Sequence, residues 1–388
     1  NMGLSSGTVS ALIVGIISAI AAPLAGIVAR DYGQGDENKI AIGSAGVCIA
    51  STILIYLLAL RGKTAKRGST GYLIFFAFFT FACMCDLWLG LAIDNINPLF
   101  SFYLVNGEPY LNTAHGSGLN WWDATAHFLL YLRFIQAMID GSDHLYAALY
   151  WTGSICGSLI IMVPAVFTGQ HSGEVKASFL LNLPFILLPL FYCRLIINQE
   201  SGNHLHMASY TKEEEEKLKD NKNYIRDIPI ACAILGMISI YMLRFFAVFK
   251  SKWSIVEPII NEVDTLYLYD PSNYLLMHGV VQFFYVVPLY FLFLEKIILG
   301  KGYVSGTILN VAIVNFGHVC QAEFSFMKGA FHPMNKYGNL IKHDRFLTAH
   351  VGAIVISGLV AWHCLVCSNP SIGGLHILFP SPQKVKKR

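Results

Sequence analysis

Long apolar segments, separated by short polar ones, dominate the hydrophobic pattern of this 388-residue chain. About 20 apolar residues in a helix span the roughly 30 Å hydrocarbon core of a bilayer. Segments of that length must be helical, because no water satisfies the backbone groups in hydrocarbon. The pattern therefore predicts an all-α, polytopic membrane protein with about ten transmembrane helices. The predicted spans are 9–29, 40–60, 72–96, 121–139, 145–168, 177–197, 228–249, 274–294, 303–327 and 346–366, of which 121–139 and 303–327 are the most polar.

The composition agrees with a membrane protein. Apolar residues make up 55% of the chain and charged residues 13%, and the net charge of +3 leaves no basic face for nucleic acid. Most of the nine cysteines fall inside predicted spans, where thiols act as small apolar side chains. The spacing of His363, Cys364, Cys367 and His376 fits none of the usual zinc patterns, so we expect neither a metal nor another cofactor.

The distribution of lysine and arginine indicates the orientation of the spans. If the C-terminus is cytoplasmic, the loops on that side carry 15 basic residues and the other side carries nine, which follows the positive-inside rule. We therefore expect both termini in the cytoplasm. The basic tail, with Lys384 and Lys386, resembles a KxKxx retrieval signal; the alternative is a basic cluster attracted to anionic lipid.

A charged segment divides the spans into two sets. It covers 199–227 and includes the run KEEEEK at 212–217, which is typical of a solvated cytoplasmic linker. The four spans before it and the four after it start at offsets of 156, 153, 158 and 169 residues, an approximately constant step that indicates a tandem repeat. The predicted organisation is two N-terminal helices in 1–68, four-helix domains in 69–198 and 228–367, the linker 199–227, and a cytoplasmic tail in 368–388.

Polar side chains inside the spans of the first half mark a candidate ligand site. An ionisable group at membrane depth costs at least about 2.5 kcal/mol to insert, so it usually faces the bundle interior and serves a function. Two carboxyls in one dry pocket repel each other and lose hydration, so the pKa of at least one should rise. The pair then offers a protonated acid beside a carboxylate base. The alternatives are structural: Asp123 caps the fourth helix, and Asp86 hydrogen-bonds a neighbouring helix. The candidate residues are Asp86, Trp88, Asp94, Trp122, Asp123, His127 and Asn182.

The second half carries a different set of polar residues. Arg244 takes the place of Asp86, and no carboxyl pair is visible in the predicted spans. A polar pocket paired through Arg244 and Glu323 is one interpretation, and structural hydrogen bonding between helices is the other. The predicted cluster consists of Arg244, His278, Gln282, Gln321 and Glu323.

Several sequence runs resemble a known family, the transmembrane 6 superfamily. The resemblance lies in GEPYLNTAHG at 107–116, WDATAHFLLYL at 122–132 and QAEFSFM at 321–327. The order of the segments and the length of the chain also match, so the resemblance covers nearly the whole chain. It implies two EXPERA domains, the four-helix module shared with emopamil-binding protein, a sterol Δ8-Δ7 isomerase, and with the sigma-2 receptor. By position, Asp86 and Asp123 resemble the acids of the isomerase and Asn182 the polar group of the last helix. Both acids are aspartates here, and the second half lacks them.

The resemblance implies an endomembrane protein that binds sterol or another lipid and regulates sterol and triglyceride handling or lipoprotein lipidation. The alternatives are a sterol Δ8-Δ7 isomerase with Asp86 and Asp123 as catalytic acid and base, and a lipid transporter or scramblase. Expected partners are membrane lipids and lipid-handling or lipoprotein-assembly proteins. We expect residence in the endoplasmic reticulum with early Golgi cycling; the lysosomal membrane is the alternative.

Overall fold

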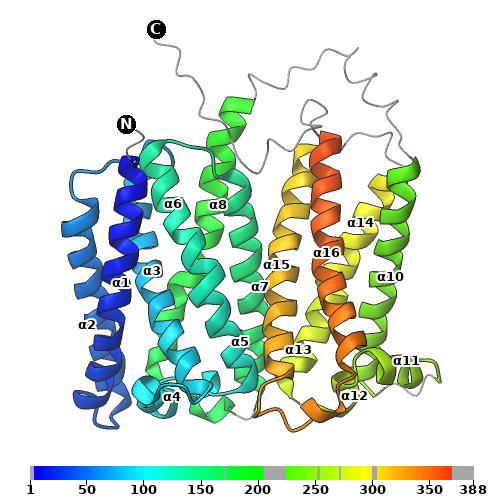
Figure 1. The fold of residues 1–388 in the computed structure, drawn as a ribbon, viewed down its shortest axis with the longest axis horizontal. Helices are drawn as coiled ribbons and strands as arrows, with labels where there is room; N and C mark the ends of the chain where they lie inside the picture. Colours follow the sequence, from blue (N-terminus) through cyan, green and yellow to red (C-terminus); the bar gives the residue numbers. More distant parts are fainter. Residues whose placement is uncertain are drawn as a thin grey trace.

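A computed structural model describes residues 4–169, 171–204, 224–250, 254–270, 272–298 and 304–368, and this part of the chain contains helices and no strand. Long helical segments run side by side along one direction (Figure 1). The first six are α1 (Ser6–Asp31), α2 (Glu37–Ile55) with a π-helical end (Tyr56–Leu60), α3 (Thr70–Ile93), α5 (Ala114–Trp122) continued by α6 (Phe128–Asp140), α7 (Leu145–Thr168), and α8 (Leu183–His204). The remaining four are α10 (Tyr224–Val248), α13 (Asn273–Val281) continued by α14 (Val287–Ile298), α15 (Gly306–Ala330), and α16 (His343–Ser368).

Eight of the described segments are long and apolar enough to cross a membrane, which confirms the polytopic all-α class. The other two long segments, 114–140 and α15, are the two that the sequence marked as most polar. Helix α15 lies in the middle of the molecule, in contact with α5, α7 and α16 (Figure 1). It therefore packs largely against protein, and a helix in that position tolerates polar side chains that lipid would reject.

The first segment starts and the last one ends at the same end of the bundle, the upper end in Figure 1. The opposite end carries the two long connectors, each folded into short helices. The first contains α4 (Ser101–Asn106) and a 3-10 turn (Pro109–Leu111), and the second contains α11 (Val256–Val263) and α12 (Leu266–Tyr269). The start of α1, the end of α8 and the end of α16 thus lie away from these short helices.

The fourth span begins earlier than its hydropathy predicted. Thr113 caps the helix by accepting a hydrogen bond from the backbone N–H of Gly116, so the connector is shorter than the predicted 97–120. Asp123 lies within the helix, at the start of a π-helical turn that covers Asp123–His127. The capping role considered for Asp123 is therefore wrong.

The two halves meet through an interface of α7 and α15 in which glycine brings the backbones together. A Cβ added at Gly153 would lie 1.8 Å from the carbonyl oxygen of Val314, and one at Gly317 would lie 1.9 Å from that of Tyr150. Small residues permit such close approach between membrane helices, where packing drives association. This contact fixes the second half against the first.

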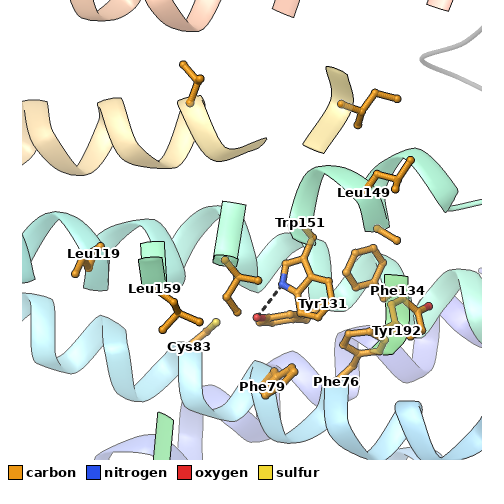
Figure 2. Packing of buried hydrophobic residues seen from close by; sticks show 14 of the residues in the cluster. Phe76, Phe79, Cys83, Leu119, Tyr131, Phe134, Leu149, Trp151, Leu159 and Tyr192 are labelled. Atoms are coloured by element: carbon orange, nitrogen blue, oxygen red, sulfur yellow. Dashed lines mark hydrogen bonds between the residues drawn. The ribbon is translucent and has the colours of Figure 1, made fainter. Parts of the chain in front are cut away.

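An aromatic core fills the upper part of the first half, above the level of the candidate acids. Trp151 of α7 is fully buried and donates a hydrogen bond to the hydroxyl of Tyr131 at 3.0 Å (Figure 2). Phe76, Phe134 and Tyr192 pack around this pair from α3, α6 and α8. Aromatic rings occupy this region densely, and the cavity that the candidate acids line lies nearer the connectors.

Candidate functional site

A cavity of about 140 Å³, here called the inner cavity, lies in the first half below the aromatic core. Its walls come from the first four-helix set and also from the two N-terminal helices, through Ala25 of α1 and Ser44 and Cys48 of α2. Most of its surface is apolar, with a few carboxyl and amide groups, which is the usual make-up of a small-molecule site. The two N-terminal helices therefore complete the wall of this cavity.

Three carboxyl groups line the inner cavity: Asp86 of α3, Asp123 at the start of the π-helical turn, and Glu108 of the first connector. The three are close enough to interact electrostatically. Asp86 makes no hydrogen bond and no ion pair within the described part of the chain. A lone carboxyl at membrane depth is costly unless a partner compensates it, so Asp86 is open to a ligand group.

Asp123 is held by its own helix. Its Oδ1 lies 2.5 Å from Nδ1 of His127, and the other ring nitrogen of His127 lies 2.8 Å from the hydroxyl of Ser154. Trp122 donates to the same hydroxyl at 2.9 Å. The i, i+4 spacing of Asp123 and His127 thus brings them together as the sequence suggested, and π-helical turns of this kind often accompany functional sites.

Glu108 is the cavity residue that sequence reasoning missed. It is buried in a connector rather than in a span, and it accepts hydrogen bonds from Tyr103 at 3.1 Å, from Asn182 at 2.8 Å and from Tyr110. Burial raises the pKa of the Glu108 carboxyl despite these donors. The available signal was the position of this carboxyl, between Tyr103 and Tyr110 in the sequence and at the start of the family-like run at 107–116.

Of the predicted first-half residues, Asp86, Asp123 and Asn182 line the inner cavity, whereas Trp88, Asp94, Trp122 and His127 do not. Asp94, just past the end of α3, instead joins the two halves: it pairs with Lys328 at 2.7 Å and with His332 at 3.0 Å. Burial alone would raise the pKa of Asp94, but hydrogen bonds from Lys328, Ser117 and Trp121 outweigh that effect and lower it. The prediction of Asp94 as a ligand-contacting residue finds no support in this geometry.

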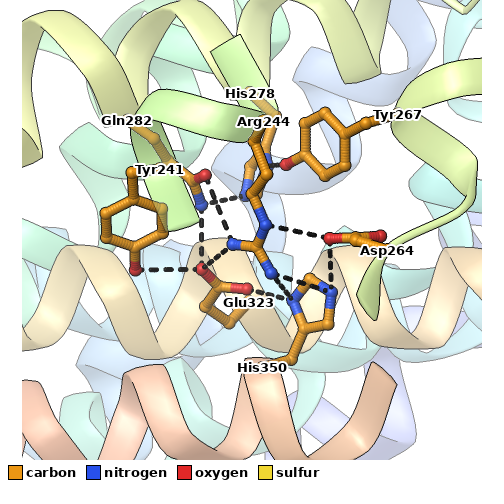
Figure 3. A network of polar contacts seen from close by, with 8 residues as sticks. All are labelled: Tyr241, Arg244, Asp264, Tyr267, His278, Gln282, Glu323 and His350. Atoms are coloured by element: carbon orange, nitrogen blue, oxygen red, sulfur yellow. Dashed lines mark hydrogen bonds and ion pairs between the residues drawn. The ribbon is translucent and has the colours of Figure 1, made fainter. Parts of the chain in front are cut away.

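A fully buried ionic network occupies the second half (Figure 3). Arg244 of α10 lies between two carboxylates: its Nε is 2.9 Å from Asp264, and its Nη1 is 3.3 Å from Glu323. His350 bridges the same two carboxylates, at 3.1 Å from Asp264 and in direct contact with Glu323. The cluster is charge-balanced when His350 carries a proton, which is the condition for burying so many charges together.

Hydrogen bonds extend this network to its neighbours. Gln282 donates to Glu323 at 2.8 Å and lies 3.1 Å from His278, which contacts the hydroxyl of Tyr267. The rings of Tyr241 and Tyr267 both face the guanidinium of Arg244 at 5.4 Å. The network thus holds four of the five predicted residues.

The structure adds one residue to the predicted cluster and removes another. The predicted spans hold one carboxyl, Glu323, but Asp264 enters the bundle from the second connector and joins Glu323 on Arg244. Gln321 does not belong to the network; it donates to Ser325 on its own helix. Gln282 begins a π-helical turn (Gln282–Val286), as Asp123 does in the first half.

A larger cavity of about 560 Å³, here called the outer cavity, lies beside the inner one at the connector end. Both halves build it. The first half supplies residues 110–116 and the end of α7, and the second supplies 270, 272–274 and 334–337. Its lining mixes apolar side chains with hydrogen-bonding ones.

Comparison with known proteins gives consistent matches. A family model described as "Transmembrane 6 superfamily member 2-like, transmembrane domain" matches residues 27–206. The protein named Transmembrane 6 superfamily member 2 from Mus musculus is 26% identical over 357 residues, which is 88% of this chain and 90% of the relative. Its namesake from Homo sapiens is also 26% identical, over 82% of this chain and 85% of the relative. No solved structure gave a significant match.

Proposed function

Because this chain belongs to the transmembrane 6 superfamily, we propose that it is a multi-pass endomembrane protein that binds a sterol or another lipid and regulates lipid metabolism. The proposal places the polar end of the lipid in the inner cavity, against Asp86. The apolar walls suit a ring system or an alkyl chain, and the carboxyl groups suit a hydroxyl or a cationic head.

The unpartnered carboxyl of Asp86 is the observation that carries this proposal. Buried polar groups in native proteins are normally hydrogen-bonded, and those inside membranes pair or mark a substrate path. Asp86 lines a cavity, faces two further carboxyls and has no bonding partner within the described residues. A ligand hydroxyl or ammonium would supply that partner.

Saturation binding of radiolabelled cholesterol to the purified full chain tests the proposal. Asp86→Asn keeps the shape of the side chain but replaces a charge-assisted hydrogen bond with a neutral one, so we expect about a tenfold loss of affinity. Asp31→Asn is the matched control, because Asp31 lies on the exposed end of α1 and pairs with Arg30. Equal affinity in the wild type and both variants would exclude Asp86 as the ligand contact.

A sterol Δ8-Δ7 isomerase is the second candidate function, favoured by the three acids in one cavity. One acid would protonate the ring double bond, and a carboxylate would remove a proton from the adjacent carbon, so the double bond shifts without a redox cofactor. Incubation with a Δ8 sterol tests this: conversion that Asp86→Asn or Asp123→Asn abolishes supports it. Binding without conversion at high protein concentration argues for the regulator alone.

A lipid transporter or scramblase has less support. The aromatic core around Trp151 fills the bundle above the inner cavity, so a polar path through the first half is closed in this conformation. If lipid moves between leaflets faster in liposomes that contain the protein than in empty vesicles, the transporter or scramblase function is supported.

Our proposal for the cellular setting is the endoplasmic reticulum, with early Golgi cycling, two EXPERA domains and both termini in the cytoplasm. The matching order of elements supports the repeat: each half has a connector with short helices and a π-helical turn in its second long segment. Lys384 and Lys386 of the tail and most of the linker 199–227 lie outside the described residues. A C-terminal tag that proteases digest in intact microsomes supports the orientation, and a protected tag contradicts it.

A further inference from the structure

The inner and outer cavities are neighbours that share a wall. Leu111 of the first connector, Leu119 of α5 and Met162 of α7 line both cavities. All three are apolar, and Met162 has a flexible, unbranched side chain that adapts to different shapes. These three residues therefore form the constriction at which the two spaces meet.

The volumes show why the inner cavity alone is too small for a whole lipid. Small-molecule pockets usually enclose about 300 to 1,000 Å³. The inner cavity, at about 140 Å³, falls below that range, whereas the outer one, at about 560 Å³, lies within it. A ligand with its polar head at Asp86 must extend past the constriction into the outer cavity.

The far side of the outer cavity comes from the second half and is suited to a polar group. Asp270, Asn273 and Lys336 line it there, and Tyr274 stacks on His115 across the junction of the halves with ring centroids 3.8 Å apart. Its near side, at the constriction, is apolar. Along the combined space the lining therefore changes from carboxyl groups to apolar side chains and then to mixed polar groups.

We propose that the two cavities form one composite site and that the second half supplies the outer wall of the ligand site, in addition to its own ionic network. The ligand class that fits is an amphiphile with an apolar middle and hydrogen-bonding groups at both ends, such as a sterol with an oxidised side chain. This inference rests on the proposed lipid-binding function. It assigns the second half a role that a single four-helix module does not have.

Photolabelling with two sterol probes tests the composite site. One probe carries a diazirine near the head hydroxyl, and the other carries it at the end of the side chain. In the full chain, the head probe is expected to label peptides around Asp86 and Asp123, and the tail probe peptides that contain residues 272–274 or 334–337, with both signals reduced by excess cholesterol. Tail labelling confined to first-half helices would overturn the composite site, whereas the absence of competable labelling by either probe would reject the proposed function itself.

The ligand class has a separate test in the binding of cholesterol and of an analogue with a carboxylate at the end of its side chain. The wild type should bind the carboxylated analogue several-fold more tightly than cholesterol, and Lys336→Ala should remove that advantage. Lys342→Ala is the control, because Lys342 lies on the same connecting loop but pairs with Glu262. Equal binding of the two sterols by the wild type would contradict a ligand that is polar at both ends.

Discussion

The contact between α7 and α15 depends on the absence of a side chain at Gly153, and Gly153→Ala tests this directly. The added Cβ would lie 1.8 Å from the carbonyl oxygen of Val314, and ordinary contact begins at 3.4 Å, so the helices must separate by about 1.6 Å. The clash is with backbone, which has no rotamer to move. The substitution therefore displaces the whole second half relative to the first at this point.

The energetic cost follows from that displacement. Overpacking a dense interior costs about 1 to 3 kcal/mol, and a gap of 0.5 to 1 Å already forfeits about a quarter to a half of each dispersion contact. Gly157 is also close to its neighbour, since a Cβ there would lie 2.2 Å from Nδ1 of His318. The same helix pair thus has a second point that resists adjustment, and we expect a loss of about 3 kcal/mol in the free energy of unfolding.

A thiol-reactive dye that fluoresces when buried cysteines become exposed measures this change in the purified chain. Cys83, Cys320 and Cys364 are buried and report unfolding. The melting temperature of Gly153→Ala should fall by roughly 5 °C or more. Gly352→Ala on α16 is the matched control, because a Cβ there meets nothing within 4 Å, and its melting temperature should be unchanged or slightly higher. Identical melting of Gly153→Ala, Gly352→Ala and the wild type would refute the close backbone contact.

Three further predictions concern charged groups. Arg244→Met leaves two buried carboxylates without their cation, so it should cost about 3 to 5 kcal/mol and abolish the monodisperse peak in size-exclusion chromatography; a normal peak would show that the network is dispensable. Asp94→Asn removes the ion pair with Lys328 and should cost about 1 kcal/mol at pH 7. Because the pKa of Asp94 is lowered in the folded state, this contribution is present above its unfolded value of about 3.9 and is lost as the pH falls through the folded pKa, so thermal melts of the two proteins should converge in acid. The pKa of Glu108 is raised, so its neutral form stabilises the fold below about pH 4.3, and this stability is lost as the pH rises through the folded pKa. Glu108→Gln should remove that pH dependence from the melting temperature, and an unchanged profile would show that another group is responsible.

The sequence singled out the two carboxyls of the inner cavity that lie inside spans. Asp86 and Asp123 stood out because a charge in an apolar run has a known cost, and both line the inner cavity. Glu108 and Asp264 were missed because they lie in connectors, where a charge is normally solvated and carries no signal. Each connector folds back into the bundle and buries its carboxyl beside a tyrosine or an arginine, and hydropathy alone does not show this.

The sequence by itself determined that the chain is a helical membrane protein, how its spans are ordered, and which charges lie at membrane depth. These properties follow from local rules: the length of an apolar run, the helical period and the cost of charge in hydrocarbon. Only the tertiary structure decided that Asp94 ties the halves together, that Arg244 is neutralised by Asp264 and Glu323, and that the second half forms part of the outer cavity. These outcomes depend on contacts between residues far apart in the chain, whose pairing is set by packing and close backbone approach and has no local signature.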